Sequence, residues 1–364
     1  MKKILVAPLD WGLGHATRTI PIIYAFLCRG WKVDLAVSGR VAALYKGQFP
    51  DLEQIPVPGY QIEYPSRGFV MPLWLLKNST RLMSVILREQ KAAQKLVQER
   101  GYDVIFSDNR FGFHAEGAYN IYMTHQLSIA FPGPFAALEK IGVVWHAREM
   151  SRFDSIWVPD FPEYPGMAGK LSHVPKTKAE YVGALSRFAD LDFLNMDWGK
   201  KYRFAAILSG PEPMRTSFEK ALLKAFEKIP GEHVVIRGLP GDAALPKAPS
   251  NVKLYNHLET AEFARIVLSA EYCISRPGYS TVMDMVYLGA NCIFVPTPGQ
   301  TEQVYLGKAL HSAHQAGLLK QDEISAKSLT AATREKHQSW NFNASGNLLS
   351  QAIDRLESKL SSTV

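Results

Sequence analysis

The chain has little cysteine, no long apolar run and no internal repeat, and each absence excludes a class of protein. Only 3 of its 364 residues are cysteines. This odd number, without motif spacing, predicts reduced core thiols and a cytoplasmic protein. No segment approaches about 18 consecutive apolar residues, so a membrane-spanning helix is not expected. The chain begins with a short apolar run that leads directly into a predicted strand, unlike a cleavable signal peptide.

Metal and nucleic-acid motifs are also missing. The histidines on predicted loops lack the tight spacing of metal ligands, so no metal and no other cofactor are expected. No RNA-binding signature or dense run of Lys and Arg is present, which argues against a nucleic-acid partner. Thr17 stands where the dinucleotide-binding fingerprint would have its third glycine, which disfavours a nicotinamide enzyme.

The composition is ordinary for a globular protein, but the charge is distributed unevenly. Hydrophobic residues make up 47% and charged residues 21% of the chain, and 364 residues predict two domains. The net charge is +7, and residues 1–100 carry all of it, with 14 Lys and Arg against 7 Asp and Glu. This basic region either binds an anionic partner, such as a membrane surface or a phosphorylated acceptor, or is a solvated face without one.

Short apolar runs alternate with helix-like segments along the whole chain, which predicts the α/β class with two Rossmann-like, doubly wound parallel sheets. The expected domains are 1–185, 186–345 and a C-terminal helix in 346–364. Strands are expected at 4–9, 32–37, 104–107, 121–124, 155–158, 204–209, 234–237, 252–255, 272–275 and 292–295. Helices are expected at 16–29, 217–228, 259–269, 280–288 and 347–359.

Residues 69–100 form a distinct segment, because an apolar start is followed by scattered basic residues. Met83, Ile86 and Leu87 continue an apolar helical face. Such a segment either packs on the sheet as an ordinary helix or lies in a lipid interface.

The first group of candidate site residues surrounds His15, in the turn between the first predicted strand and helix. Glycines permit a tight turn there and the close approach of a ligand to backbone N–H groups. The positive end of the helix dipole favours a neutral imidazole, which suits a general base for an attacking hydroxyl. A histidine that only caps the turn is the alternative. Asp10 either orients His15, binds the acceptor or caps the turn, and we assign both residues to catalysis.

Polar residues also follow the strands expected at 104–107 and 121–124. In a doubly wound sheet, ligands bind beyond the carboxyl ends of the strands. These residues therefore either bind the hydroxyls or phosphate of an acceptor or form a local capping network. The residues assigned to the acceptor are Gly14, Arg18, Asp108, Asn109 and His125.

The second half carries a stronger pattern, at residues 276–284 and 294–303. A basic residue, a glycine turn, two hydroxyls and a carboxylate meet where a strand joins a helix. These groups suit a nucleotide diphosphate with an attached sugar, with Arg276 at the phosphates and Asp284 at the ribose. Arg187 either reaches the same phosphates or forms an interdomain salt bridge. The residues assigned to the donor are Arg187, Ser209, Gly210, Leu258, Arg276, Gly278, Ser280, Thr281, Asp284, Glu302 and Gln303.

With these motifs the chain resembles the GT-B glycosyltransferases, especially their MurG-like branch. Two segments carry the resemblance: Gly12-Leu-Gly-His15-Ala-Thr-Arg18, and residues 275–281 with 298–303. The resemblance implies two domains that face each other across a cleft, with the acceptor on the first and a UDP-sugar on the second.

The resemblance also implies roles for particular residues. His15 would be the general base, Arg187 would lie near the diphosphate, and Gly210 would belong to the phosphate loop. Ser280 and Thr281 would contact phosphate and ribose. The carboxylate of Asp284 would bind the ribose, and Gln303 would bind the donor sugar.

The expected function is inverting transfer of a hexose, with N-acetylglucosamine as one candidate, from a UDP-sugar to a hydroxyl acceptor. A lipid-linked or cell-envelope glycan is one candidate acceptor. The protein would then be cytoplasmic, with peripheral contact to an anionic membrane through the basic N-terminal region as one option. The alternatives are a nucleotide-sugar hydrolase, an epimerase, and a binding subunit that needs a partner for activity.

Overall fold

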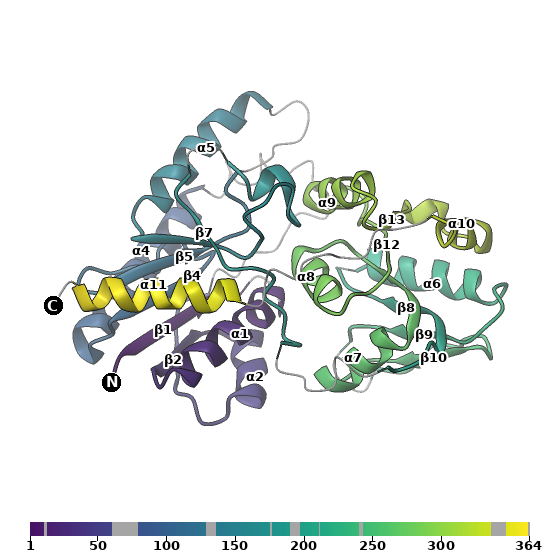
Figure 1. Cartoon of the computed structure of the whole chain (residues 1–364), viewed down its shortest axis with the longest axis horizontal. Helices are drawn as coiled ribbons and strands as arrows, with labels where there is room; N and C mark the ends of the chain where they lie inside the picture. The colour runs from purple at the N-terminus through teal and green to yellow at the C-terminus, as the bar shows by residue number, and fades with distance from the viewer. Residues whose placement is uncertain are drawn as a thin grey trace. The chain divides into compact units, whose positions relative to one another are not determined.

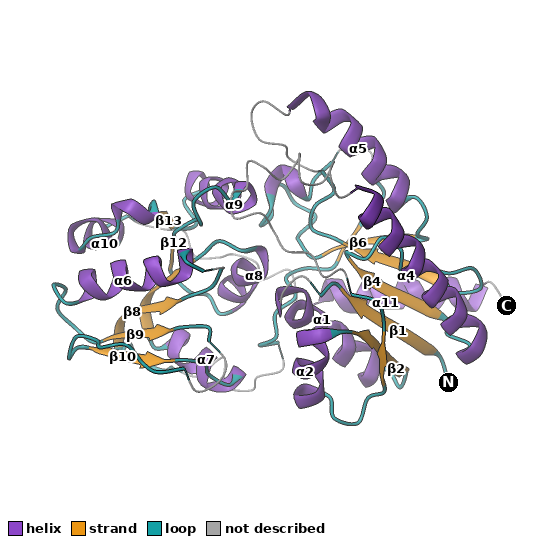
Figure 2. Cartoon of the chain, turned by 180° about the vertical axis from the view of Figure 1, so that it is seen from behind, coloured by secondary structure: helices purple, strands orange, loops and turns teal. Residues whose placement is uncertain are grey.

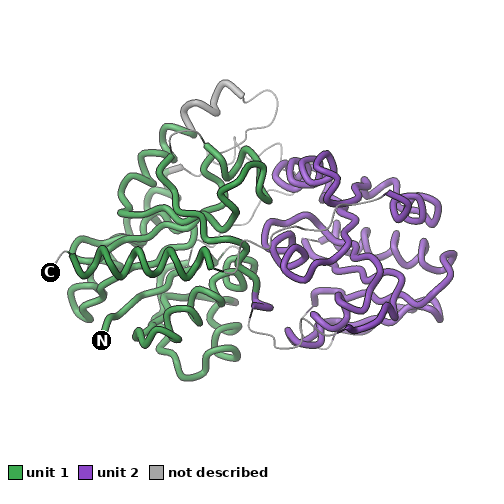
Figure 3. The backbone as a smooth tube through the Cα atoms, viewed as in Figure 1, with its two compact units in different colours: residues 1–186, 343–364 green, residues 187–342 purple. Residues whose placement is uncertain are grey.

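The computed structural model describes residues 1–10, 13–59, 79–128, 136–174, 177–189, 197–210, 212–239, 243–335 and 347–362. The chain divides into two compact units (Figure 3). Unit 1 comprises Met1–Ser186 and Asn343–Val364, and unit 2 comprises Arg187–Phe342. The predicted glycine turn at residues 11–12 and the apolar stretch at 69–78 lie outside the described residues. Within the described residues, no helix is long and apolar enough to span a membrane.

Unit 1 is built on a parallel sheet of seven strands, in the order β3-β2-β1-β4-β5-β6-β7. The order reverses between β1 and β4, and such switch points are where open α/β sheets bind ligands. Strands β1, β2 and β4 are buried almost throughout, because helices cover both faces of a parallel sheet. The strands are β1 Lys3–Pro8, β2 Lys32–Val37, β3 Gln54–Pro56, β4 Val104–Asp108, β5 Tyr119–Met123, β6 Ser155–Val158 and β7 Glu180–Tyr181.

Helices lie on both faces of this sheet, with α4 and α11 on opposite sides (Figures 1 and 2). One core cluster joins Leu5 of β1 and Ile105 of β4 to Ala93 and Val97 of α4. The elements of unit 1 are α1 Leu13–Cys28, α2 Gly39–Gln48, α4 Ser79–Arg100, α5 Ala136–Met150, η3 Gly169–Leu171 and α11 Leu348–Ser362.

Of the segment expected at 69–100, the part in helix α4 packs on the sheet through Ala93 and Val97. Of the predicted apolar face, Ile86 is buried, but Met83 and Leu87 are 44% and 51% exposed. The predicted apolar face is therefore divided between the protein core and the solvent. Met83 and Leu87 are separated by four positions, so their side chains share the solvent face of the helix.

The C-terminal helix α11 packs against unit 1. The indole Nε1 of Trp31 donates to Glu357 at 2.8 Å, and Arg29 forms an ion pair with Asp354. Glu180 of β7 accepts from Arg355 at 3.1 Å. The chain thus returns to unit 1 after forming unit 2.

Unit 2 has a parallel sheet of six strands in the order β10-β9-β8-β11-β12-β13, which reverses between β8 and β11. Its main core cluster includes Phe204, Phe218 and Leu222. The strands are β8 Tyr202–Ile207, β9 His233–Ile236, β10 Val252–Tyr255, β11 Ala270–Ser275, β12 Cys292–Phe294 and β13 Gly317–Leu318. The helices are α6 Met214–Phe226, α7 Thr260–Leu268, α8 Tyr279–Tyr287, α9 Thr301–Ser312, η4 Gln321–Glu323 and α10 Ala326–Ala332.

The three cysteines have different environments. Cys273 and Cys292 are buried register partners on β11 and β12. Burial raises the pKa of the Cys273 thiol to about 12, which suits an inert core residue. Cys28 is exposed, so its prediction as a core thiol is wrong. It is the last residue of α1, and its side chain faces solvent.

Candidate active site

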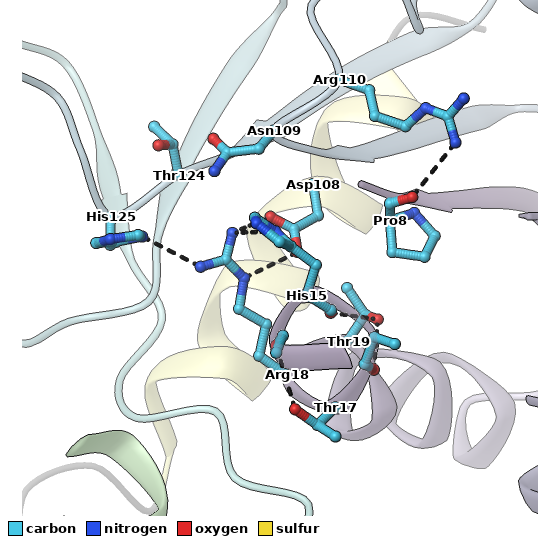
Figure 4. Close-up of polar contacts among 12 residues, drawn as sticks. Pro8, His15, Thr17, Arg18, Thr19, Asp108, Asn109, Arg110, Thr124 and His125 are labelled. Carbon is cyan, nitrogen blue, oxygen red and sulfur yellow. Dashed lines mark hydrogen bonds and ion pairs between the residues drawn. The ribbon is translucent and has the colours of Figure 1, made fainter. Parts of the chain in front are cut away.

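A polar cluster lies at the carboxyl ends of the central strands of unit 1 (Figure 4). His15 is in the first turn of α1, directly after β1, and Arg18 is one turn further along the same helix. Asp108 is the last residue of β4, and His125 follows β5. The strand order places these residues at the switch point between β1 and β4 and next to it.

Asp108 is the centre of the cluster. One of its oxygens, Oδ2, lies 3.1 Å from Nδ1 of His15 and accepts from Nε of Arg18 at 2.8 Å. The other oxygen accepts from Nη2 of Arg18. Asp108 and Arg18 are almost fully buried, whereas the side chain of His15 is 20% exposed. Of these three residues, only His15 is therefore accessible to a substrate.

The contact with Asp108 indicates which nitrogen of His15 carries the proton. A carboxylate only accepts, so its approach to Nδ1 favours a proton there. Nη2 of Arg18 also lies 3.0 Å from Nδ1, and a guanidinium only donates. The contact with Asp108 decides the position of the proton, because Nη2 of Arg18 already donates to Oδ1 of Asp108. A lone pair on Nδ1 of His15 would be repelled by Oδ2 of Asp108. The resulting tautomer leaves Nε2 of His15 with a lone pair, as a general base requires.

The electrostatics of the cluster favour a neutral His15 beside a charged Asp108. Burial lowers the pKa of His15, Asp108 opposes this, and the charge of Arg18 lowers it further. For Asp108, burial alone would raise the pKa. The charges of Arg18 and His15 and their hydrogen bonds outweigh burial and lower the pKa of Asp108 to about 2. The pair is thus a carboxylate and a neutral imidazole near neutral pH.

The structure brings together four of the predicted site residues, which are His15, Arg18, Asp108 and His125. It also changes the predicted roles of Asp10 and Arg18. Asp10 accepts from Ser38 at 2.9 Å, and the residue that lies against Nδ1 of His15 is Asp108. Orientation of His15 therefore passes from Asp10 to Asp108, and acceptor binding or capping remains for Asp10. Arg18 was predicted at the acceptor, yet its guanidinium is buried among the other members of the cluster.

The remaining residues predicted at the acceptor lie near the same strand ends. Asn109 follows β4 with a left-handed φ of 58° and accepts from Tyr122 Oη at 3.1 Å. Asparagine tolerates this backbone conformation better than most residues. Gly14 is in the first turn of α1, where its carbonyl accepts from Thr17. His125 lies 3.1 Å from Nη1 of Arg18 and is buried.

Arg110 and Glu89 form a buried ion pair that supports this edge of the sheet. Nε of Arg110 donates to Glu89 of α4 at 2.7 Å, and both side chains are fully buried. Arg110 also donates to the carbonyls of Pro8 and Pro58 (Figure 4 shows the first). The pair thus fixes the end of β1, from which the His15 turn starts. No sequence pattern distinguishes Glu89, since it is one of several charged residues on α4.

In unit 2, Arg276 follows β11, but it points into the protein interior. Nη1 donates to the carbonyls of Val295 and Pro296 at 2.8 and 3.0 Å. The guanidinium also stacks over the ring of Phe218 at 4.1 Å, and only 1% of the residue is exposed. Burial lowers the pKa of Arg276 to about 10. Phosphate contact, as predicted, would require these bonds to be exchanged, so the structure gives Arg276 a loop-positioning role.

Arg187 and Asp284 were predicted at the diphosphate and the ribose, and the structure places them side by side. Nε of Arg187 lies 3.6 Å from Oδ2 of Asp284, and both side chains are partly exposed. The guanidinium stacks on the rings of Phe188 and Phe263 at 4.9 and 4.8 Å. This ion pair lies within unit 2. These contacts fix the orientation of Arg187, which suits it to meet an anion without a large entropic loss.

Asp284 belongs to helix α8, which begins three residues after Arg276. Gly278 is the N-cap and has no side chain to cap this end, and Ser280 and Thr281 are in the first turn. Its backbone N–H groups therefore offer a site for an anion. Ser209 and Gly210 are exposed after β8, with Gly210 at a φ of +101° that favours glycine.

Thr297 is a candidate that the sequence reasoning missed. It lies in the loop after β12, close to Gly210. If Gly210 carried a Cβ atom, the nearest atom to it would be Oγ1 of Thr297, at 3.8 Å. Its hydroxyl is buried without a hydrogen-bond partner among the described residues. The oxygen of Gln303 accepts from the backbone N–H of Thr297 at 2.8 Å, which holds the loop in place. The proline and glycine residues of this loop single out residues 294–303 in the sequence, but they do not single out Thr297.

The other predicted donor residues are dispersed around the same edge. Glu302 and Gln303 are in the first turn of α9, and both are partly exposed. Leu258 is buried just before α7, so only its backbone is suited to contact a nucleobase. The described residues contain no group of three or more His, Cys, Asp or Glu that could hold a metal ion.

Comparisons with known proteins agree with this architecture. Residues 220–352 match the sequence profile described as the glycosyltransferase family 28 C-terminal domain. A protein of Methanosarcina acetivorans, described as an uncharacterized glycosyltransferase, is 23% identical over 316 residues, covering 83% of this chain and 81% of that protein. The predicted resemblance to GT-B glycosyltransferases is thus confirmed.

Solved structures extend the comparison to the whole chain. The glycotransferase of kitacinnamycin superimposes with a TM-score of 0.67 at 16% identity, covering 99% of both chains. MurG of Acinetobacter baumannii gives 0.63 at 14% identity, covering 98% of this chain and 100% of that one. At these identities the likeness concerns the fold, and it confirms the predicted GT-B fold.

Proposed function

We propose that this chain, a glycosyltransferase of the GT-B type, transfers a hexose from a UDP-sugar to a hydroxyl acceptor with inversion. The observation that carries the proposal is the contact between His15 and Asp108 at the switch point of unit 1. It supports a base with one accessible, unprotonated nitrogen. The family 28 domain of unit 2 supports a nucleotide-sugar donor there.

In this mechanism His15 takes the proton of the acceptor hydroxyl on Nε2. The acceptor oxygen attacks the anomeric carbon, and the bond from that carbon to the phosphate oxygen breaks, so UDP leaves with its bonding electrons. Asp108 stabilises the imidazolium that forms, because its carboxylate lies against Nδ1. Attack opposite the leaving group inverts the anomeric centre.

The donor is assigned to unit 2. The N-terminus of α8 and the guanidinium of Arg187 offer positive charge for the diphosphate, which supports a reaction without a metal. Asp284 is suited to accept from the ribose hydroxyls, and Glu302 and Gln303 to bind those of the sugar. N-acetylglucosamine remains one candidate sugar.

The acceptor is assigned to unit 1, and a lipid-linked molecule is one candidate. Helix α4 supports this option, because Met83 and Leu87 are exposed on a helix that also exposes Arg88, Lys91 and Lys95. Apolar side chains beside lysine and arginine suit the surface of an anionic membrane. The proposed location is therefore cytoplasmic, with peripheral contact to the membrane.

The decisive experiment measures UDP release from a panel of UDP-sugars, with and without polyprenyl-phosphate-linked and soluble hydroxyl acceptors. Acceptor-dependent release with a new glycoside of inverted configuration supports the proposal. Release of free sugar without an acceptor would make the protein a hydrolase. Binding of UDP without any turnover would overturn the proposal and indicate a binding subunit.

A further inference from the structure

Arg18 makes more contacts with the catalytic cluster than any role at the acceptor explains. Its Nε and Nη2 donate to the two oxygens of Asp108, and Nη2 lies 3.0 Å from Nδ1 of His15. Nη1 lies 3.1 Å from Nδ1 of His125. The guanidinium is 3% exposed, so these contacts are shielded from water. One side chain therefore touches the base, its carboxylate partner and a second imidazole.

The shape of the guanidinium determines what these contacts do. A planar fork that donates to both oxygens of a carboxylate fixes the plane and the position of that carboxylate. Asp108 thereby stays in place to accept from Nδ1 of His15. Because Arg18 can only donate, Nδ1 of His125 must carry a lone pair toward it. Arg18 is also one helical turn from His15, so it holds the imidazole and its partner from the same helix.

We propose that Arg18 is a positioning residue that clamps Asp108 against His15 and favours the neutral imidazole of His15. This inference rests on the proposed function only in naming His15 as the base. It adds a residue that never touches the acceptor yet sets the pH range in which the base works.

The charges around His15 support this effect. Asp108 on β4 favours the protonated imidazole, whereas Arg18 on α1 and His125 after β5 disfavour it. Tyr122 on β5 and Tyr45 on α2 also feel the charge of Asp108, and burial raises the pKa of both far above the ordinary value. These phenols stay neutral at working pH. Loss of Arg18 would remove an opposing charge and leave the charge of Asp108 less balanced, so the pKa of His15 would rise.

The direction of the pH effect follows from this balance. A base works only when it is unprotonated, so activity rises with pH through the pKa of His15. If Arg18 is replaced by Met, the acid limb of the kcat/KM profile moves to higher pH, and activity at the acid end falls relative to the plateau. Arg18→Lys keeps the charge but loses the fork, so its acid limb stays nearer that of the native protein while kcat falls at every pH.

The test records the titration of the His15 ring by NMR in the native protein, Arg18→Met and Arg18→Lys, with His15→Gln to assign the signal. We expect the native ring to titrate below the ordinary histidine range and the Met variant to titrate higher. An unchanged titration in Arg18→Met, or a native ring that titrates above the ordinary range, would overturn the proposal.

The two readouts separate this inference from the proposed function. The NMR titration needs no turnover, so it can succeed even if the chain transfers no sugar. If both Arg18 variants fail to fold, a native ring that titrates above the ordinary range still overturns the proposal, because Arg18 and burial must together outweigh Asp108. A shifted titration with unaffected transfer in His15→Ala would overturn the base assignment but leave the role of Arg18.

Discussion

Asp108 lies 3.1 Å from Nδ1 of His15, although 93 positions separate the two residues in the chain. The contact exists because β1 and β4 are neighbours in the sheet and because His15 begins the helix that follows β1. It turns an accessible histidine at a helix N-terminus into an oriented base. The fold therefore creates the pair, and the pair creates the reactivity that we assign to unit 1.

Replacement of His15 by Ala should lower kcat by about 10²-fold or more, because general-base assistance contributes at least that much. The Kd for UDP should stay close to that of the native protein, since the donor is assigned to unit 2. Steady-state UDP release and calorimetric titration with UDP provide the two measurements. Native-like turnover in this variant would remove His15 from the base role.

The two aspartates near the His15 turn should differ in importance. Asp108→Asn keeps the shape but loses the charge that fixes the tautomer of His15, so kcat should fall by about 10²-fold or more. Asp10→Asn should cost much less in kcat, because Asp10 bonds to Ser38. Thermal melting of both variants controls for folding. A larger loss from Asp10→Asn would restore Asp10 as the orienting residue.

Asp284→Ala should weaken UDP binding by about tenfold, the effect of losing a charge-assisted hydrogen bond worth about 1.5 kcal/mol. Arg187→Ala should have a similar effect. The double variant should lose less than the sum, because the two side chains lie 3.6 Å apart and act as a pair. Asp322→Ala, an exposed carboxylate of the same unit, is the matched control. Unchanged UDP affinity in Asp284→Ala would refute the ribose assignment.

Removal of the charge of Glu89 should destabilise the protein by about 3 to 5 kcal/mol, because it breaks the buried ion pair with Arg110. The exposed pair of Lys95 and Glu99 on the same helix provides the control, and Glu99→Gln should cost less than about 0.5 kcal/mol. Urea unfolding followed by circular dichroism measures both. Equal effects from Glu89→Gln and Glu99→Gln would show that the buried pair is not a structural support.

Anionic vesicles should bind the native protein more strongly than a variant with Met83→Ser and Leu87→Ser. Both side chains are exposed, so the double change should leave the melting temperature nearly unchanged. Leu245→Ser, which removes an exposed leucine of unit 2, should not affect binding. Sedimentation with phosphatidylglycerol vesicles gives the result. Equal binding by all three proteins would exclude this face of α4 as the membrane contact.

The sequence predicts the buried strands well, because parallel strands covered on both faces are short, nearly continuous apolar runs. Lys32–Val37, Ser155–Val158 and Val252–Tyr255 have the predicted boundaries. Strands β7 and β13, of two residues each, carry too little pattern to be recognised. Helix α11 was predicted, but amphipathicity alone does not say which unit its apolar face covers.

The site was harder to predict than the fold, for physical reasons. Residue type and position after a strand are enough to single out His15, Asp108 and His125. The order of the strands decides which of these residues contact one another. The sequence alone therefore offered Asp10, which is close to His15 in the chain, as a candidate to orient the base. Arg276 shows the same limit, because a basic residue at a strand end suggests phosphate binding, yet its partners are carbonyls of its own unit.

The return of the chain to unit 1 through α11 has a consequence for biosynthesis. Residues 1–186 lack the partner of Trp31 and Glu180 until the last segment has been translated. During synthesis on the ribosome, the second half of the polypeptide therefore emerges before the first half has its full set of contacts. A chain truncated after residue 342 would contain all of unit 2 but would leave unit 1 without α11.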